Sequence, residues 1–87
     1  MSDDMLISQG KAQIMVSLGF ISCASVIEEK LGFSVQFLTP DKKSVYMSDS
    51  HGMKKNFKSL DSCSKALKKL GIFIFQVELK DDTNYRL

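Results

Sequence analysis

The chain has 87 residues, enough for one domain with a modest hydrophobic core. Its composition, 44% hydrophobic and 25% charged with a formal net charge of +2, excludes a disordered segment. Two cysteines, Cys23 and Cys63, are too few for a small secreted disulfide scaffold, and the acidic start lacks the basic region of a signal peptide. We therefore expect a cytoplasmic protein whose thiols are reduced.

Residues 3–18 are predicted to form a helix, with Asp3 and Asp4 at its positive end. A strand is the alternative for part of this segment, because apolar side chains also alternate at Ala12, Ile14, Val16 and Leu18. Polar residues interrupt the stretch 5–27, which falls short of the ~20 apolar residues of a membrane-spanning helix. We expect no association with a membrane.

Residues 22–31 are predicted to form a second, amphipathic helix that ends at Gly32. The side chains expected to face the core are Cys23, Val26, Ile27 and Leu31. Three antiparallel strands are then predicted at residues 33–39, 44–48 and 53–58. Turn-forming residues at 40–43 and 49–52 separate these strands, so a meander is the simplest connection.

Residues 59–70 are predicted to form a third helix, capped by Ser59 or Asp61 and terminated by Gly71. Its apolar stripe consists of Leu60, Cys63, Leu67 and Leu70. Residues 72–79 are predicted to form the last strand, reached through a crossover and lying beside the strand 33–39. Apolar side chains occur on both of its faces, so this strand is expected to be central or covered on both sides.

These elements predict an α+β fold with the order α-α-β-β-β-α-β, in which the helices pack on a single small sheet. The expected domain spans residues 1–87, with a helical part at 1–32, a sheet-and-helix part at 33–80 and a loose tail at 81–87. An edge strand of such a sheet carries unpaired backbone groups that another strand can join. If the last strand lies outermost, residues 72–75 form an apolar edge that a two-fold dimer would cover.

The sequence contains no recognisable catalytic or metal-binding motif. The only histidine, His51, lies in a polar turn, and neither cysteine is spaced from it as in a zinc site. The carboxylates occur mainly as adjacent pairs, which are typical of helix ends and surfaces, and no Gly-rich phosphate loop is present. We expect a protein that is not an enzyme and that holds no metal or cofactor.

Positive charge is concentrated in the second half of the chain. Residues 33–80 contain nine lysines against four acidic residues, a net charge of +5, whereas residues 1–32 carry −2 and the tail −1. The candidate binding residues are Lys42, Lys43, Lys54, Lys55, Lys58, Lys65, Lys68, Lys69 and Tyr46. Such lysines bind phosphate groups or an acidic protein, or are simply solvated. Arg86 is the only arginine, which weighs against sequence-specific recognition of nucleic acid.

Residues 45–79 resemble the end of short accessory proteins carried by plasmids and integrative mobile elements. In those proteins a polar hairpin leads to a phrase like Phe57-Lys58-Ser59-Leu60-Asp61, followed by a helix ending in Leu70-Gly71-Ile72 and a final strand. The resemblance covers less than half of the chain. It implies an origin in a mobile element and a role in maintenance, regulation or inhibition of a host system, and it transfers no catalytic residue.

The leading hypothesis is a non-enzymatic protein-binding module that acts by contact with a protein partner, a homodimer being one form of that contact. A nucleic-acid-binding accessory factor is the first alternative, and it would use the lysines. A small enzyme subunit completed by a partner chain is the second alternative.

Overall fold

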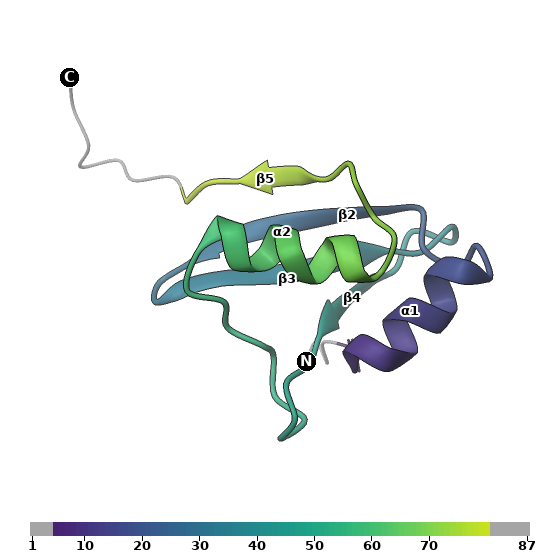
Figure 1. Cartoon of the computed structure of the whole chain (residues 1–87), viewed down its shortest axis with the longest axis horizontal. Coiled ribbons are helices and arrows are strands. Elements are labelled where there is room, and N and C mark those ends of the chain that lie inside the picture. Colours follow the sequence, from purple (N-terminus) through teal and green to yellow (C-terminus); the bar gives the residue numbers. More distant parts are fainter. Residues whose placement is uncertain (1–4, 81–87) are drawn as a thin grey trace.

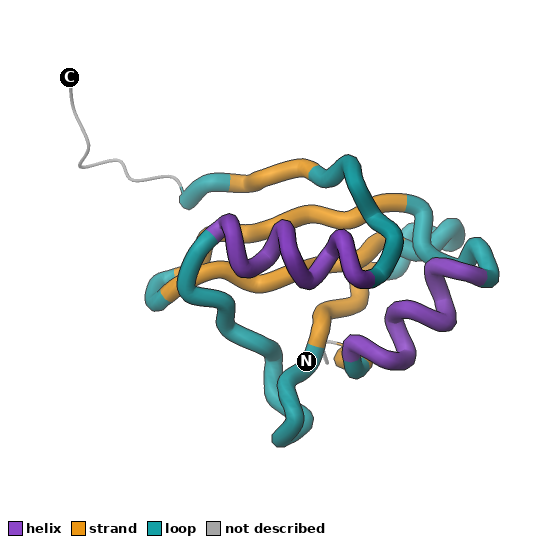
Figure 2. Tube along the Cα trace, viewed as in Figure 1, coloured by secondary structure: helices purple, strands orange, loops and turns teal. Residues whose placement is uncertain are grey.

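The described residues form a five-stranded mixed sheet and two helices (Figures 1 and 2). The structure, a computed structural model, describes residues 5–80. In chain order the elements are β1 (Met5–Ile7), α1 (Gln9–Ser17), β2 (Cys23–Glu29), β3 (Gly32–Leu38), β4 (Ser44–Met47), α2 (Leu60–Lys69) and β5 (Gln76–Glu78).

The strands lie in the order β1-β4-β3-β2-β5 across the sheet. The three central strands β2, β3 and β4 are antiparallel, whereas β1 runs parallel to β4 and β5 runs parallel to β2. The α+β composition agrees with the prediction, but the predicted order α-α-β-β-β-α-β is wrong, because the elements of residues 5–80 follow the order β-α-β-β-β-α-β. The antiparallel meander consists of β2, β3 and β4, so it begins one element earlier than predicted.

The largest correction concerns residues 22–31, which were predicted to be helical and instead contain β2. Seven residues of β2 pair with β3, from Cys23 opposite Leu38 to Glu29 opposite Gly32. The spacing of apolar residues here suits a helix and a strand equally, and pairing with a distant segment decides between them. Leu31, predicted to face the core, is 85% exposed in the two-residue turn between the strands.

The N-terminal prediction is correct only in its centre. Residues 9–17 form α1, and the Ser8 hydroxyl caps it by accepting a hydrogen bond from the Lys11 amide at 3.1 Å. Residues 5–7 are not helical, because they pair in parallel with β4 as an edge strand. The strand alternative for residues 12–18 is also wrong. The sequence contained the cap at Ser8, but the pairing partner of β1 lies some 40 residues away along the chain.

The predicted third strand at residues 53–58 is not a strand of the sheet. Two isolated bridges hold this segment, Ser48 to Lys54 and Phe33 to Phe57. The loop between Ser48 and Lys54 is closed by Asp49, whose carboxylate accepts hydrogen bonds from the amides of His51 and Met53 at 2.8 and 3.0 Å. These two bonds lower the pKa of Asp49 below its usual value.

The third predicted helix is confirmed as α2. The Ser59 hydroxyl accepts a hydrogen bond from the Ser62 amide at 3.1 Å, and the left-handed Gly71 (φ 88°) ends the helix. The last strand is shorter than predicted and lies at the edge of the sheet beside β2, not beside the strand predicted at 33–39. It is therefore neither central nor covered on both sides.

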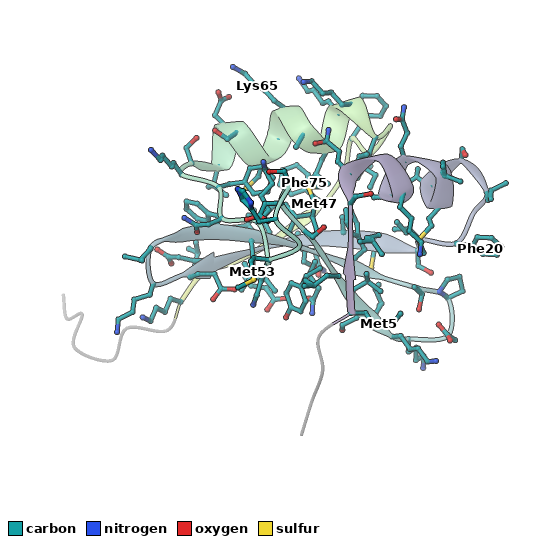
Figure 3. All side chains as sticks on the ribbon, turned by 90° about the horizontal axis from the view of Figure 1, so that it is seen from below. Met5, Phe20, Met47, Met53, Lys65 and Phe75 are labelled. Carbon is teal, nitrogen blue, oxygen red and sulfur yellow. The ribbon has the colours of Figure 1, made fainter. Side chains whose placement is uncertain are left out.

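The hydrophobic core lies between the sheet and the two helices, which occupy the same face of the sheet (Figure 3). Its largest fully buried side chains are Phe37, Met47, Leu67, Val26 and Val35. Within the described part of the chain no helix covers the other face of the sheet, called here the open face. Among residues 5–80 no helix is long and apolar enough to cross a membrane. The tail predicted at 81–87 lies outside the described residues.

Candidate functional site

Helix α1 leaves large apolar side chains uncovered. Only Ala12 is fully buried, and Met15 and Val16 are half-buried against the core. On the opposite side of the helix, Ile14 is 59% exposed and Leu18, four residues later, is 62% exposed. Residues four apart are neighbours on a helix surface, so these two form one apolar ridge. A helix with apolar residues on both sides is normally covered on both sides.

The chain after α1 turns back and, together with the β3–β4 turn, forms a groove near the end of the helix. The Phe20 amide donates a hydrogen bond to the Met15 carbonyl at 2.8 Å, and the Phe20 side chain, 54% exposed, stands at the end of the molecule (Figure 3). The groove has a volume of about 480 Å³ and is lined by Met15, Gly19, Phe20, Thr39, Pro40 and Asp41. We call Ile14, Leu18, Phe20 and this groove the α1 surface.

The β3–β4 turn forms the polar rim of the groove. The Thr39 hydroxyl donates a hydrogen bond to the Asp41 carboxylate, and Lys43 lies 3.8 Å from that carboxylate. Both interactions lower the pKa of Asp41, the hydroxyl more than the ammonium group. A second hollow of about 260 Å³ shares Met15, Thr39 and Asp41 with the groove and extends toward β1. The α1 surface thus combines an apolar floor with a charged rim.

Sequence reasoning missed the α1 surface. The sequence contained a signal for it, because the apolar residues Ile14, Met15, Val16 and Leu18 cannot all lie on one side of a helix. No local sequence pattern indicated the groove. It forms only where the end of α1 meets the β3–β4 turn, and these segments are distant in the sequence.

The predicted lysines do not form one surface. Lys65, Lys68 and Lys69 lie on the exposed side of α2, on the helix-bearing side of the sheet (Figure 3). Lys54, in contrast, pairs with a carboxylate of the open face. The remaining candidates are Lys42 and Lys43 in the β3–β4 turn, and Lys55 and Lys58 in the segment after the long loop. Three of the eight lysines lie within 4 Å of a carboxylate of residues 5–80.

Tyr46 takes part in a polar network on the open face. The Lys54 ammonium group lies 4.3 Å from the centre of the Tyr46 ring and 3.4 Å from Glu29 Oε2. Gln36 donates a hydrogen bond to the Tyr46 hydroxyl at 3.2 Å, and the buried Ser34 hydroxyl donates one to Glu29 at 2.8 Å. The Ser34 bond, with help from Lys54, lowers the pKa of Glu29. One face of the Tyr46 ring is therefore already occupied.

The groups most often used in catalysis are dispersed. His51 is exposed in the long loop, Cys23 is exposed on β2, and Cys63 is buried in α2. Burial raises the pKa of the Cys63 thiol to about 11, which keeps it protonated at neutral pH. Within residues 5–80 no three His, Cys, Asp or Glu side chains are grouped as metal ligands.

Comparison with protein-family models, with curated proteins and with solved structures gives no match for this chain.

Proposed function

We propose that the protein is a non-catalytic protein-binding module that holds its partner at the α1 surface. The observation that carries the proposal is the ridge of Ile14 and Leu18, both more than half exposed on a helix whose other side already packs on the core. Burying one such side chain contributes ~1.5–3 kcal/mol. An apolar anchor surrounded by a polar rim is the usual arrangement of an energetic centre in a protein interface.

The groove defines the chemistry of the partner. A volume of about 480 Å³ accepts one or two large apolar side chains, and its lining offers Met15, Phe20 and Pro40 for contact. Methionine is flexible and adapts to the shape of its neighbour, and an aromatic ring offers a large area at low entropy cost. We infer a partner segment that inserts an aromatic or branched aliphatic residue into the groove and lies across the ridge.

An accessory or inhibitory role fits this mode of action, since contact alone is sufficient for it. The resemblance of residues 45–79 to proteins of plasmids and integrative elements supports an origin in a mobile element, with a host protein as partner. Binding of nucleic acid is the less favoured function. Its lysines are divided between the two sides of the sheet, and pairing with carboxylates reduces the free positive charge of three of them.

Site-specific photo-crosslinking tests the proposal. A photoreactive amino acid in place of Leu18 should give one defined protein adduct in the cells that produce the protein. The same amino acid in place of Lys68, exposed on α2, serves as the matched control and should give none. Adducts of equal yield at both positions, or none at Leu18, would contradict the proposal. Nucleic acid attached at Lys68 would favour the lysine surface instead.

Substitution on the ridge provides the complementary test. The double substitution Ile14→Gln and Leu18→Gln keeps helix-forming residues on an exposed face, so α1 should fold normally. It should abolish the adduct formed by a photoreactive residue in place of Phe20. Gln13→Ala, an exposed position on the same helix, is the control and should leave that adduct unchanged. Retention of the adduct in the double variant would show that the ridge does not bind the partner.

A further inference from the structure

Strand β5 is the edge strand of the sheet on the side opposite β1. It pairs with β2 through Gln76, Val77 and Glu78, and among residues 5–80 no strand pairs with its outer side (Figure 1). The apolar side chains in and beside it are uncovered. Their exposed fractions are 73% for Phe73, 88% for Ile74, 42% for Val77 and 70% for Leu79.

The sequence of this edge lacks the features that keep edge strands from pairing. Residues 72–79 contain no proline, glycine or lysine and only one charged residue, Glu78. Natural edge strands are usually protected by such residues, and apolar segments of this kind join other strands when they are exposed. A partner for this edge is therefore expected on physical grounds.

The residues around Val77 are symmetrical in type. Val77 lies between two polar residues, Gln76 and Glu78. The next residues on either side, Phe75 and Leu79, are both apolar. Val77 lies opposite the buried Val26 of β2, so it belongs to the helix-bearing face, and Phe75 packs against the same core. Gln76 and Glu78 alternate with these residues and belong to the open face.

We propose that β5 pairs antiparallel with β5 of a second copy, about a two-fold axis that passes through Val77. Val77 then faces Val77 of the second copy, and Phe75 faces Leu79, so apolar side chains meet on the helix-bearing face. On the open face the amide of Gln76 meets the carboxylate of Glu78. The two five-stranded sheets become one continuous sheet of ten strands.

The charge of Glu78 selects this register. Moving the axis to Glu78 would place two carboxylates opposite each other, which is unfavourable. Moving it to Gln76 would place the carboxylate of Glu78 against the apolar Ile74. Of the three residues of β5 through which the axis can pass, only Val77 gives Glu78 a hydrogen-bond donor directly opposite.

A second copy also fits this edge better than a different protein does. An isologous pair uses the same edge of both copies and closes on itself, so no further chain can add to β5. The interface is small, at the low end of specific protein interfaces, so the dimer should dissociate on dilution. The pairing is independent of the α1 surface, and each copy keeps that surface free.

Sedimentation of the full chain over a range of concentrations tests the pairing. The average mass should rise from 9.8 kDa for one chain to twice that value as the concentration increases. Val77→Lys places two ammonium groups at the axis and should weaken association at least about tenfold. Gln76→Lys should instead strengthen it, because the new ammonium group meets Glu78 of the second copy, and added salt should remove the gain. A chain that stays monomeric at near-millimolar concentration, or a dimer that Gln76→Lys weakens, would overturn the proposal.

Disulfide trapping tests the position of the axis. Directly opposite residues of antiparallel strands have Cα atoms ~4.5–5.5 Å apart, a separation that a disulfide spans. In a Cys23→Ser background, Val77→Cys should form a covalent dimer under a mild oxidant. Leu79→Cys in the same background faces Phe75 and should not, which makes it the matched control. Equal trapping of both variants would contradict the register, and none of these outcomes bears on the α1 surface.

Discussion

Gly32 holds the segment around Phe57 against the start of β3, and the substitution Gly32→Ala tests this arrangement. A Cβ atom at Gly32 would fall against the Phe57 carbonyl oxygen and 2.6 Å from Asn56 Oδ1. The Asn56 side chain can rotate away, but the Phe57 carbonyl belongs to the backbone. This carbonyl accepts a hydrogen bond from the Phe33 amide at 2.7 Å, and the Phe57 amide donates a hydrogen bond to the Phe33 carbonyl at 2.7 Å.

The expected loss of stability follows from these two hydrogen bonds. Each contributes ~0.5–1.5 kcal/mol, so displacement of the Phe57 backbone should cost about 1–3 kcal/mol. Partial withdrawal of the Phe57 ring, now 6% exposed, would add to that cost. Urea denaturation measures the change as a lower midpoint at an unchanged slope. In a domain of this size the melting temperature should fall by roughly 4–8 °C per kcal/mol.

Gly10→Ala is the matched control, because no heavy atom lies within 4 Å of a Cβ placed there. Gly10 is in the first turn of α1, where alanine has the higher helix propensity, so this change should stabilise the protein slightly. If Gly32→Ala leaves the free energy of unfolding unchanged, or raises it as Gly10→Ala should, the Phe57 segment is not held at Gly32 as described.

Two further predictions concern titrating groups. The folded state lowers the pKa of Glu29 from its usual 4.5, through its bonds to Ser34 and Lys54. These bonds therefore stabilise the folded protein above pH 4.5, and this stabilisation is lost as the pH falls through the folded-state pKa. Glu29→Gln should reduce the acid-induced loss of stability in urea titrations, by less than ~1 kcal/mol because the side chain is partly exposed; an unchanged pH profile would contradict the network. Cys23 should react with a thiol reagent in the native protein at neutral pH, whereas Cys63, fully buried with a pKa of about 11, should react only after denaturation. Mass spectrometry that finds two modified thiols in the native protein would refute this.

Some elements were predictable because their signals are local. Helix α2 has a serine cap, an apolar stripe and a left-handed glycine within thirteen residues, and these act without help from the rest of the chain. The strands β3 and β4 and the turn between them likewise have alternating apolar residues on either side of Pro40. In each case the residues that signal the element lie within its own segment or next to it.

The candidate site depended on contacts that no local pattern records. In the sequence Ile14 and Leu18 belong to the alternating apolar pattern that suggested a strand, and their exposure depends on which side of α1 meets the core. The groove requires the β3–β4 turn to lie against the end of α1. For the lysines the sequence misled in the opposite way. They are concentrated in one half of the sequence, but the fold places them on different sides of the sheet.

By itself the sequence determined the α+β composition, the limits of α2, the β3–β4 hairpin and the concentration of lysine in the second half. Tertiary structure alone decided that residues 23–29 form a strand, that β1 joins β4, and that β5 lies at the edge beside β2. The physical reason is that a strand is stabilised by its partner, whereas a helix makes its hydrogen bonds within its own segment. A short apolar stretch such as β2 takes its conformation from the strand beside it.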